Sequence, residues 1–398
     1  MRMENATETA PRRPRLTATA ESVLRMIATG AARVAAEPLA SVPRRLLIVK
    51  VHGMGDSVLI RLIIEQLKKR NPDIDIGVLA GPATREMLTM STELRVHSYD
   101  QKALSMRSAY SALREIRRAG YDAVLNVEQG SIAGTAFIAC TGIPIHVGFV
   151  PIDDDPKARF LTHGVRFEES RSMWQSFVAL SQIVDPGVTE VAQRLVIPPR
   201  PETERWLSEW WRVNIGGDRR ENTVALHLGC GPGMDFKRWP IDNFVALAEQ
   251  ISREARRVTI ILTGTALERP LIRKFLTAYR GRAVDASDAG NLERTAAILS
   301  SSHLLVSNDT GVMHLGAALG VPTVGVFGPA SPRHWAPVGE RAIYVYDTNV
   351  PCSPCVNNYH NRMPSRCANV DQSRCLRDVT VESVLTAARR VVLHNFLG

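Results

Sequence analysis

Short apolar runs alternate along this chain with longer segments whose apolar residues recur at helical spacing. Val, Leu and Ile dominate residues 46–51, 74–80 and 123–127, a composition typical of strands buried on both faces. Residues 58–69 follow the first run and repeat apolar residues with a helical period. Strands that alternate with helices in this way predict a parallel sheet with right-handed crossovers.

The alternation begins again after a proline-rich segment, Pro198-Pro-Arg-Pro201, which is typical of a linker. Residues 224–228 and 258–263 are again apolar, with a helical segment at 242–254 between them. We therefore predict an α/β protein in which two Rossmann-like domains with parallel sheets face a cleft. The predicted divisions are a flexible N-terminal extension at 1–45, a first domain at 46–200, a second domain at 201–380 and a C-terminal helix at 381–398.

One βαβ unit of the second half, residues 304–328, organises the candidate chemistry. Its first strand ends in Asp309, Thr310 and Gly311, at the sheet edge where ligands of such folds bind. The glycine permits close approach, and free N–H groups of the following helix suit a phosphate. Asp309 is an anion and fits better as an acceptor for hydroxyl groups beside that phosphate. The alternative is that Asp309 and Thr310 only cap the helix.

The first predicted strand is followed by Gly53, Met54, Gly55 and Asp56. The two glycines permit a tight turn into a helix, but the third glycine of a dinucleotide fingerprint is replaced by Val58. A nicotinamide or flavin site is therefore not expected. Asp56 would lie at the cleft end of the strand, where a general base is needed, or it could serve only as a helix cap.

Two further charged residues follow strands of the second half. Lys237 comes after a glycine-rich loop and could neutralise a diphosphate leaving group. Glu268 comes after the next strand and could accept hydrogen bonds from both ribose hydroxyls. The structural alternatives are a basic surface residue and a favourable first-turn charge. No pair of carboxylates stands beside these loops, and the acidic cluster at 153–155 lies in a proline-flanked loop, so no catalytic metal is expected.

Four cysteines near the C-terminus have the spacing C-x2-C-x11-C-x7-C: Cys352, Cys355, Cys367 and Cys375. Four thiolates can close a tetrahedral site for zinc or iron and leave no open position, so such a metal would be structural. The alternative is that all four are simply reduced thiols. The surrounding segment, 351–376, is rich in Asn and Pro and has few apolar residues to order it by burial.

The composition and net charge of the whole chain limit the kinds of partner that we expect. The chain has 398 residues, is 45% hydrophobic and carries a formal net charge of +9, which suits anionic ligands or an anionic membrane surface. No basic run is interleaved with aromatic residues, so no nucleic-acid partner is expected. No apolar stretch has the length of a transmembrane helix or a secretory signal. We therefore expect a cytoplasmic protein, peripheral at the inner face of the cytoplasmic membrane.

Together these segments resemble glycosyltransferase family 9, the ADP-heptose:lipopolysaccharide heptosyltransferases. The resemblance is carried by LLIVKVHGMGD, LHLGCGPGMDFKRWP, LTGTALE, SNDTGVMHLGAALGVPTVGVFGP and PCSPC. It implies a GT-B fold and metal-independent, inverting transfer of a sugar, usually heptose, from a nucleotide-sugar donor such as ADP-heptose to a lipid-linked glycan acceptor, the lipopolysaccharide core. It also implies residue roles: Asp56 as catalytic base in a loop with Gly53 and Gly55, Lys237 on the donor phosphate, Glu268 on the ribose, and Asp309, Thr310, Gly311 and His314 on the donor sugar and diphosphate.

Two other functions remain open at this point. A nucleotide-sugar epimerase of the same fold would need further acid–base residues in the cleft, where only His314 offers itself. A non-enzymatic binding module could use the basic surface and the cysteines, but it would give the Gly-Asp and Asp-Thr-Gly loops no role.

Overall fold

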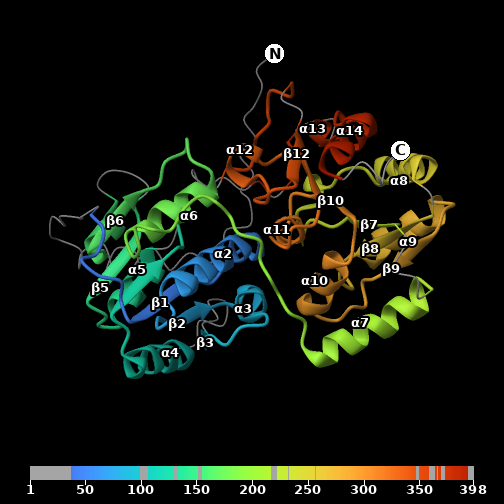
Figure 1. Cartoon of the computed structure of the whole chain (residues 1–398). Coiled ribbons are helices and arrows are strands. Elements are labelled where there is room, and N and C mark those ends of the chain that lie inside the picture. Colours follow the sequence, from blue (N-terminus) through green and yellow to red (C-terminus); the bar gives the residue numbers. More distant parts are fainter. Residues whose placement is uncertain are drawn as a thin grey trace, which may run out of the picture.

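The structure is a computed structural model with two parallel sheets, and it places the N- and C-terminal halves of the chain side by side (Figure 1). The residues that it describes are 37–98, 106–129, 132–150, 155–216, 222–231, 233–255, 257–346, 349–357, 364, 366–368 and 373–392. The first 36 residues of the predicted extension therefore lie outside the described residues. Residues 37–44 lie on the first half, where the Leu39 N–H donates to the Ile183 carbonyl at 2.8 Å.

The first half contains a six-stranded, all-parallel sheet of order β3-β2-β1-β4-β5-β6. Its strands are β1 (Arg45–Lys50), β2 (Asp75–Ala80), β3 (Arg95–Ser98), β4 (Ala123–Asn126), β5 (Ile145–Val150) and β6 (His163–Arg166). Its helices are α2 (Met54–Arg70), α3 (Pro82–Thr89), α4 (Met106–Ala119), α5 (Ile132–Ala139) and α6 (Met173–Gln182), with a 3-10 turn η1 (Pro156–Phe160).

The second half repeats this topology, with the order β12-β11-β10-β7-β8-β9. Its strands are β7 (Asn222–His227), β8 (Val258–Thr263), β9 (Ala283–Asp285), β10 (Leu304–Asn308), β11 (Thr323–Phe327) and β12 (Ala342–Tyr346). Its helical elements are α7 (Pro201–Asn214), η2 (Asp235–Lys237), α8 (Ile241–Glu254), α9 (Arg269–Ala278), α10 (Leu292–Ser300), α11 (Gly311–Ala318), α12 (Pro332–Trp335), α13 (Arg374–Arg377) and α14 (Val381–Val391).

The predicted α/β architecture is confirmed, and the hydrophobic pattern missed only strands at the edges of the sheets. The four unpredicted strands are β3, β6, β9 and β12, which close the two sheets on either side. Their residues are mostly half-buried or exposed, whereas β1 and β10 are buried almost throughout. An edge strand has one neighbour and less apolar cover, so its sequence lacks the continuous apolar run that marks a central strand.

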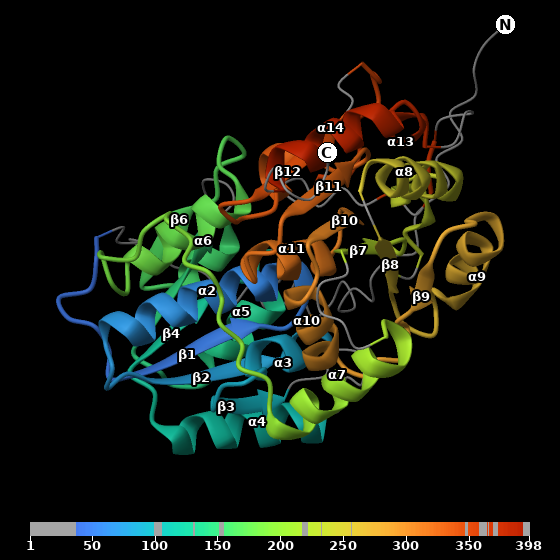
Figure 2. The same ribbon diagram turned by 45° about the vertical axis from the view of Figure 1, so that its right-hand side comes forward.

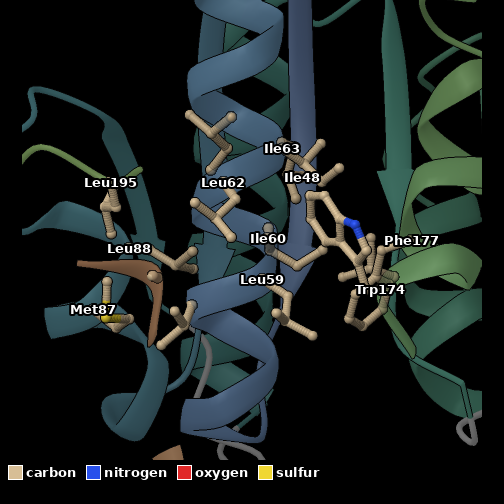
Figure 3. Close-up of a cluster of buried hydrophobic side chains, with 14 of the residues drawn as sticks. Ile48, Leu59, Ile60, Leu62, Ile63, Met87, Leu88, Trp174, Phe177 and Leu195 are labelled. Carbon is tan, nitrogen blue, oxygen red and sulfur yellow. The ribbon is translucent and has the colours of Figure 1, made fainter. Parts of the chain in front are cut away.

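Helix α2 is deeply buried along most of its length because it is covered from several directions. Figure 3 shows its apolar side chains, such as Ile63, between β1 and the aromatic rings of Trp174 and Phe177 from α6, with Leu88 of α3 on the other side. Such close packing holds a helix rigidly. The first turn of α2, which carries Asp56, is therefore built on a fixed element.

The two halves meet where α2 approaches α11, and the connecting chain runs along this contact (Figure 1). The Leu195 N–H in the connection donates to the Ala318 carbonyl at the end of α11, at 2.7 Å. The predicted linker leads directly into α7, and Pro201 is the first residue of this helix. Helix α14 packs on α8, β11 and β12 of the second half (Figure 2). Within the described ranges, no helix has both the length and the apolar character that crossing a bilayer requires.

Candidate active site

A cleft of about 930 Å³ lies between the two halves, where the carboxyl ends of both sheets face each other. It is lined by the first turn of α2 from one half and by the loops after β7, β8 and β10 from the other. The structure brings together in this cleft all nine residues that the sequence singled out for base, loop and donor roles: Gly53, Gly55, Asp56, Lys237, Glu268, Asp309, Thr310, Gly311 and His314.

The loop after β1 presents Asp56 from the first turn of α2. Gly53 adopts φ +84°, a conformation that side-chain-bearing residues rarely take, and it is the residue at the N-cap position. Asp56 lies within the helix and makes no cap; its Oδ2 is 2.7 Å from Nζ of Lys50. The cap alternative therefore does not account for this carboxylate.

The lysine beside Asp56 is itself surrounded by carboxylates, which the sequence did not reveal. Lys50 is the last residue of β1, and its Nζ also lies 3.5 Å from Oε1 of Glu128, the second residue after β4. Burial lowers the pKa of Lys50, but Asp56 and Glu128 outweigh this effect and raise it above its ordinary value. Burial alone would raise the pKa of Glu128, but Lys50 and hydrogen bonds from His52 lower it to about 2.

The loop after β10 faces this first loop across the cleft. Thr310 is the N-cap residue of α11 but makes no side-chain cap, so a cap does not explain its identity. Its hydroxyl lies 3.2 Å from that of Ser307. Asp309 instead pairs with Lys237 of η2, with 2.6 Å between Oδ2 and Nζ. A lysine and the N-terminus of a helix thus converge on one wall of the cleft, as a diphosphate requires.

The imidazole of His314 lies at the point of closest approach between the two halves. A Cβ added to Gly55 would come within 2.9 Å of the ring, and one added to Gly311 would collide with Met54. Gly55 is therefore required by the close approach of the His314 ring, and a larger residue at position 311 would force the Met54 side chain to move. Burial lowers the pKa of His314 despite the opposing effect of Asp309 and Asp56. The ring is neutral at pH 7 and poorly suited to act as a cationic acid.

Glu268 is buried at the start of α9, close to the glycine-rich loop after β7. Its Oε2 accepts hydrogen bonds from the backbone N–H and the hydroxyl of Thr265, at 2.8 and 2.5 Å. A Cβ on Gly229 would come within 2.6 Å of its side chain, so only glycine fits there. His227 of β7 is a buried histidine: burial lowers its pKa to about 4, and its Nδ1 lies within hydrogen-bond distance of the Thr263 hydroxyl.

Asn308 is a positioning residue that was not among the candidate residues from the sequence. It is completely buried, and its amide donates to the carbonyls of Leu228 and Gly229, each at 3.0 Å. Its Oδ1 accepts the N–H of Trp239 at 2.9 Å. Asn308 therefore ties the end of β10 to the loop that carries Lys237. The sequence did contain a signal for this role, because Asn308 is a polar residue at the end of a buried strand, directly before Asp309.

The four cysteines lie close enough together for the other three to act electrostatically on Cys375. Cys375 is buried, Cys355 and Cys367 are half-buried and Cys352 is exposed. Burial, together with the other three thiols, raises the pKa of Cys375 to about 12. In the part of the chain that the structure describes, no group of three or more His, Cys, Asp or Glu side chains is arranged to hold a metal ion.

The fold and this cleft define a two-domain, nucleotide-sugar type of glycosyltransferase, and comparison with known proteins agrees. The model of glycosyltransferase family 9 (heptosyltransferase) matches residues 109–364. The chain belongs to this family, which confirms the resemblance noted in the sequence.

Among curated relatives, lipopolysaccharide heptosyltransferase 2 of Salmonella typhimurium is 26% identical over 322 residues, which cover 75% of this chain and 86% of the relative. Among solved structures, the Escherichia coli ADP-heptose lps heptosyltransferase II superposes with a TM-score of 0.64 at 19% identity, over 87% of this chain and 98% of the other. The iron-containing dodecameric glycosyltransferase TibC from enterotoxigenic E. coli superposes with a TM-score of 0.50 at 12% identity, over 89% and 77%.

Proposed function

We propose that this protein transfers a heptose from ADP-heptose to a hydroxyl of the lipopolysaccharide core, with inversion at the anomeric carbon. The observation that carries the proposal is the meeting of two loops across one cleft. Asp56 enters from the first half, and Lys237 enters with the N-terminus of α11 from the second. The relatives whose names include lipopolysaccharide and ADP-heptose supply the substrate classes.

In this mechanism Asp56 takes the proton of the acceptor hydroxyl as its oxygen attacks the anomeric carbon. The new carbon–oxygen bond forms while the bond from the anomeric carbon to the diphosphate breaks, and ADP leaves with the electron pair. A positioned base of this kind contributes roughly 10²- to 10⁴-fold to the rate. The ammonium of Lys50, 2.7 Å from Oδ2, holds the Asp56 carboxylate in place.

The second half supplies the donor site. Lys237 and the uncapped first-turn N–H groups of α11 stabilise the departing diphosphate. Asp309 accepts hydrogen bonds from donor-sugar hydroxyls, and Glu268 uses its second oxygen, Oε1, for the ribose. These positive groups do the work of a divalent ion, so we propose a reaction without a catalytic metal.

The deciding experiment incubates the purified protein with ADP-heptose and delipidated core oligosaccharide, and reads both compounds by mass spectrometry and NMR. We expect one heptose to be added to the acceptor, with ADP released and no dependence on added Mg²⁺. An altered donor with an unchanged acceptor would indicate an epimerase, and two unchanged compounds would indicate a binding module. A parallel panel of ADP-, GDP- and UDP-sugars identifies the base and the sugar.

The acceptor is lipid-linked in the cell, so we propose that the protein works at the inner face of the cytoplasmic membrane as a peripheral enzyme. The positive net charge supports attraction to anionic lipid. Sedimentation with vesicles of anionic and of zwitterionic lipid tests this location. We expect binding to the anionic vesicles alone, and less of it as salt is raised. Equal recovery in the supernatant with both would contradict it.

We also propose a structural zinc or iron ion on Cys352, Cys355, Cys367 and Cys375. Four thiols supply the ligand type that zinc and iron prefer, although the described side chains are not arranged around one point. Burial, together with the other three thiols, raises the pKa of Cys375, and a bound cation would oppose this effect and favour the thiolates. The iron-containing neighbour TibC points the same way. Elemental analysis of protein purified without a metal column should find one ion per chain, and far less in Cys352→Ser/Cys355→Ser than in the control Cys140→Ser. Protein without bound metal in which all four of these thiols can be titrated would refute this.

A further inference from the structure

A buried lysine between two carboxylates stands directly behind Asp56. The Lys50 side chain is 3% exposed, and its Nζ lies 2.7 Å from Oδ2 of Asp56 and 3.5 Å from Oε1 of Glu128. Burying an ammonium is costly unless it is paired and hydrogen-bonded. The chain nevertheless places one here, at the end of a central strand that faces the cleft.

Glu128 does more than balance this charge, because it also fixes the loop that leads to Asp56. Its Oε1 accepts the backbone N–H groups of Val51 and His52, at 2.7 and 2.9 Å. The N–H of Glu128 is in turn held by the Asn126 side chain at 3.1 Å. The loop after β1 is thus tied to the end of β4 through one carboxylate.

We propose that Lys50 and Glu128 are positioning residues that set the orientation and the basicity of Asp56. This inference rests on the proposed function of Asp56 as the base. Lys50 occupies Oδ2, whereas Oδ1 has no hydrogen-bond donor among the described residues and is available for the acceptor hydroxyl. A rigidly held carboxylate keeps its free oxygen in the position needed for proton transfer.

The second carboxylate has an electrostatic purpose. An ammonium in contact with Asp56 alone would make that carboxylate a weak base, because it stabilises the charged form. Glu128 shares the ammonium, so the three groups together carry one negative charge. Loss of Glu128 should therefore leave Asp56 ionised to lower pH but less able to accept a proton. Loss of Lys50 should do the opposite, because two carboxylates would then repel each other.

Other titratable groups also face this site, and the test must separate them. His52 is half-exposed, with its Nδ1 3.7 Å from Oε2 of Glu128. From the second half come His314, against the Asp56 loop, and behind it Lys237 and Asp309. The variant His52→Gln keeps the backbone N–H that Glu128 accepts, so it is the matched control for a change of charge near Glu128.

The experiment measures kcat, the donor KM and the pH profile of kcat for Glu128→Gln, Lys50→Met, His52→Gln and Asp56→Asn. Gln keeps an acceptor for both backbone N–H groups, so Glu128→Gln should fold. We expect its kcat to fall roughly tenfold, a fraction of what a full base provides, with donor KM unchanged and the acidic limb moved to lower pH. The limb of Lys50→Met should move to higher pH, and that of His52→Gln should not move.

The double variant Asp56→Asn/Glu128→Gln shows whether Glu128 acts through Asp56. If it does, the double variant is no slower than Asp56→Asn, whereas an independent role gives a further tenfold loss and overturns the inference. Wild-type kinetics in Glu128→Gln, with Asp56→Asn inactive, would refute the positioning role and leave the base in place. An active Asp56→Asn would instead refute the proposed base. If Lys50→Met fails to fold, Glu128→Gln and the double variant still decide.

Discussion

The two halves of the molecule each present a lysine–aspartate pair to the same cleft, and the pairs differ in what surrounds them. Lys50 and Asp56 are 2.7 Å apart, with the lysine 3% and the aspartate 16% exposed. Lys237 and Asp309 are 2.6 Å apart, with exposures of 16% and 11%. Lys50 has a second carboxylate, Glu128, whereas Lys237 has Asp309 as its sole ion-pair partner in the described ranges.

The difference teaches how one kind of ion pair serves two purposes. The first pair is enclosed by strands and by Glu128, so its lysine cannot turn toward a ligand and acts only on Asp56. The second pair sits on the cleft wall beside the N-terminus of α11, so its lysine can serve a phosphate when one arrives. The burial of the lysine therefore decides its role: a buried lysine only holds its aspartate, whereas a lysine on the cleft wall can exchange its aspartate for a bound phosphate.

The largest contrast should come from making the same substitution in both aspartates. Asp56→Asn removes the base, so kcat should fall by roughly 10²- to 10⁴-fold while ADP affinity stays the same. Asp309→Asn should act chiefly on donor binding and leave most of kcat. Single-turnover rates and calorimetric titration with ADP separate the two effects. Equal losses of kcat in both variants would mean that the two aspartates do not differ in role as proposed.

The next effect is on stability and distinguishes the two lysines. Lys50→Met leaves Asp56 and Glu128 as neighbouring carboxylates with no cation, and breaking a buried pair in this way costs about 3–5 kcal/mol. Lys237→Met should cost less, because Lys237 is more exposed than Lys50 and leaves one carboxylate at the cleft rather than two without a cation. Denaturant titration of both variants at pH 7 measures the difference. Comparable losses would mean that both pairs are structural.

The pH dependence of the free energy of unfolding should distinguish the site around Lys50, through Glu128, from the pair of Lys237 and Asp309. The pKa of Glu128 is about 2 in the folded protein, against an ordinary value of 4.5. A depressed pKa contributes stability that is present above pH 4.5 and lost as the pH falls through about 2, with a total of roughly 3 kcal/mol. The stability difference between wild type and Glu128→Gln should therefore shrink across this window. A difference that stays constant down to pH 2 would contradict it.

How much of this could be predicted from sequence depends on the range of each interaction. The strands β1 and β10 and the charged loops after them were predicted because each motif lies within a few consecutive residues, next to a buried strand. The fold class followed from the alternation of elements. Asp56 and Asp309 were singled out for the same local reason.

The partners of those aspartates could not be read from the chain. Glu128 reaches Lys50 only because β1 and β4 are paired in the sheet, and Asn308 reaches Gly229 only because β10 and β7 are neighbours. These contacts join residues about 80 positions apart, so no local pattern indicates them. The edge strands were missed for a different reason, because half-exposed strands need no continuous apolar run.

A moderate effect is expected on nucleotide binding. Lys237→Met should weaken ADP binding by about 1.5–3 kcal/mol, the range for a hydrogen bond to a charged group. Lys50→Met, where it folds, should keep the affinity of wild type, since its ammonium does not face the donor. Calorimetry with ADP measures both. An unchanged affinity of Lys237→Met for ADP would mean that Lys237 does not bind the diphosphate.

The smallest effect concerns a carboxylate that bridges the two halves at the rim of the same cleft. Glu86 of α3 accepts the backbone N–H of Leu292, the first residue of α10, at 2.5 Å. A negative charge at a helix N-terminus contributes about 0.3–1 kcal/mol. If this contact favours the closed cleft, Glu86→Gln should weaken ADP binding roughly two- to fivefold, and added salt should reduce the difference. Glu93→Gln changes an exposed glutamate of the same half and is the control. Equal ADP affinities in the two variants would mean that the contact between Glu86 and Leu292 does not favour the closed cleft.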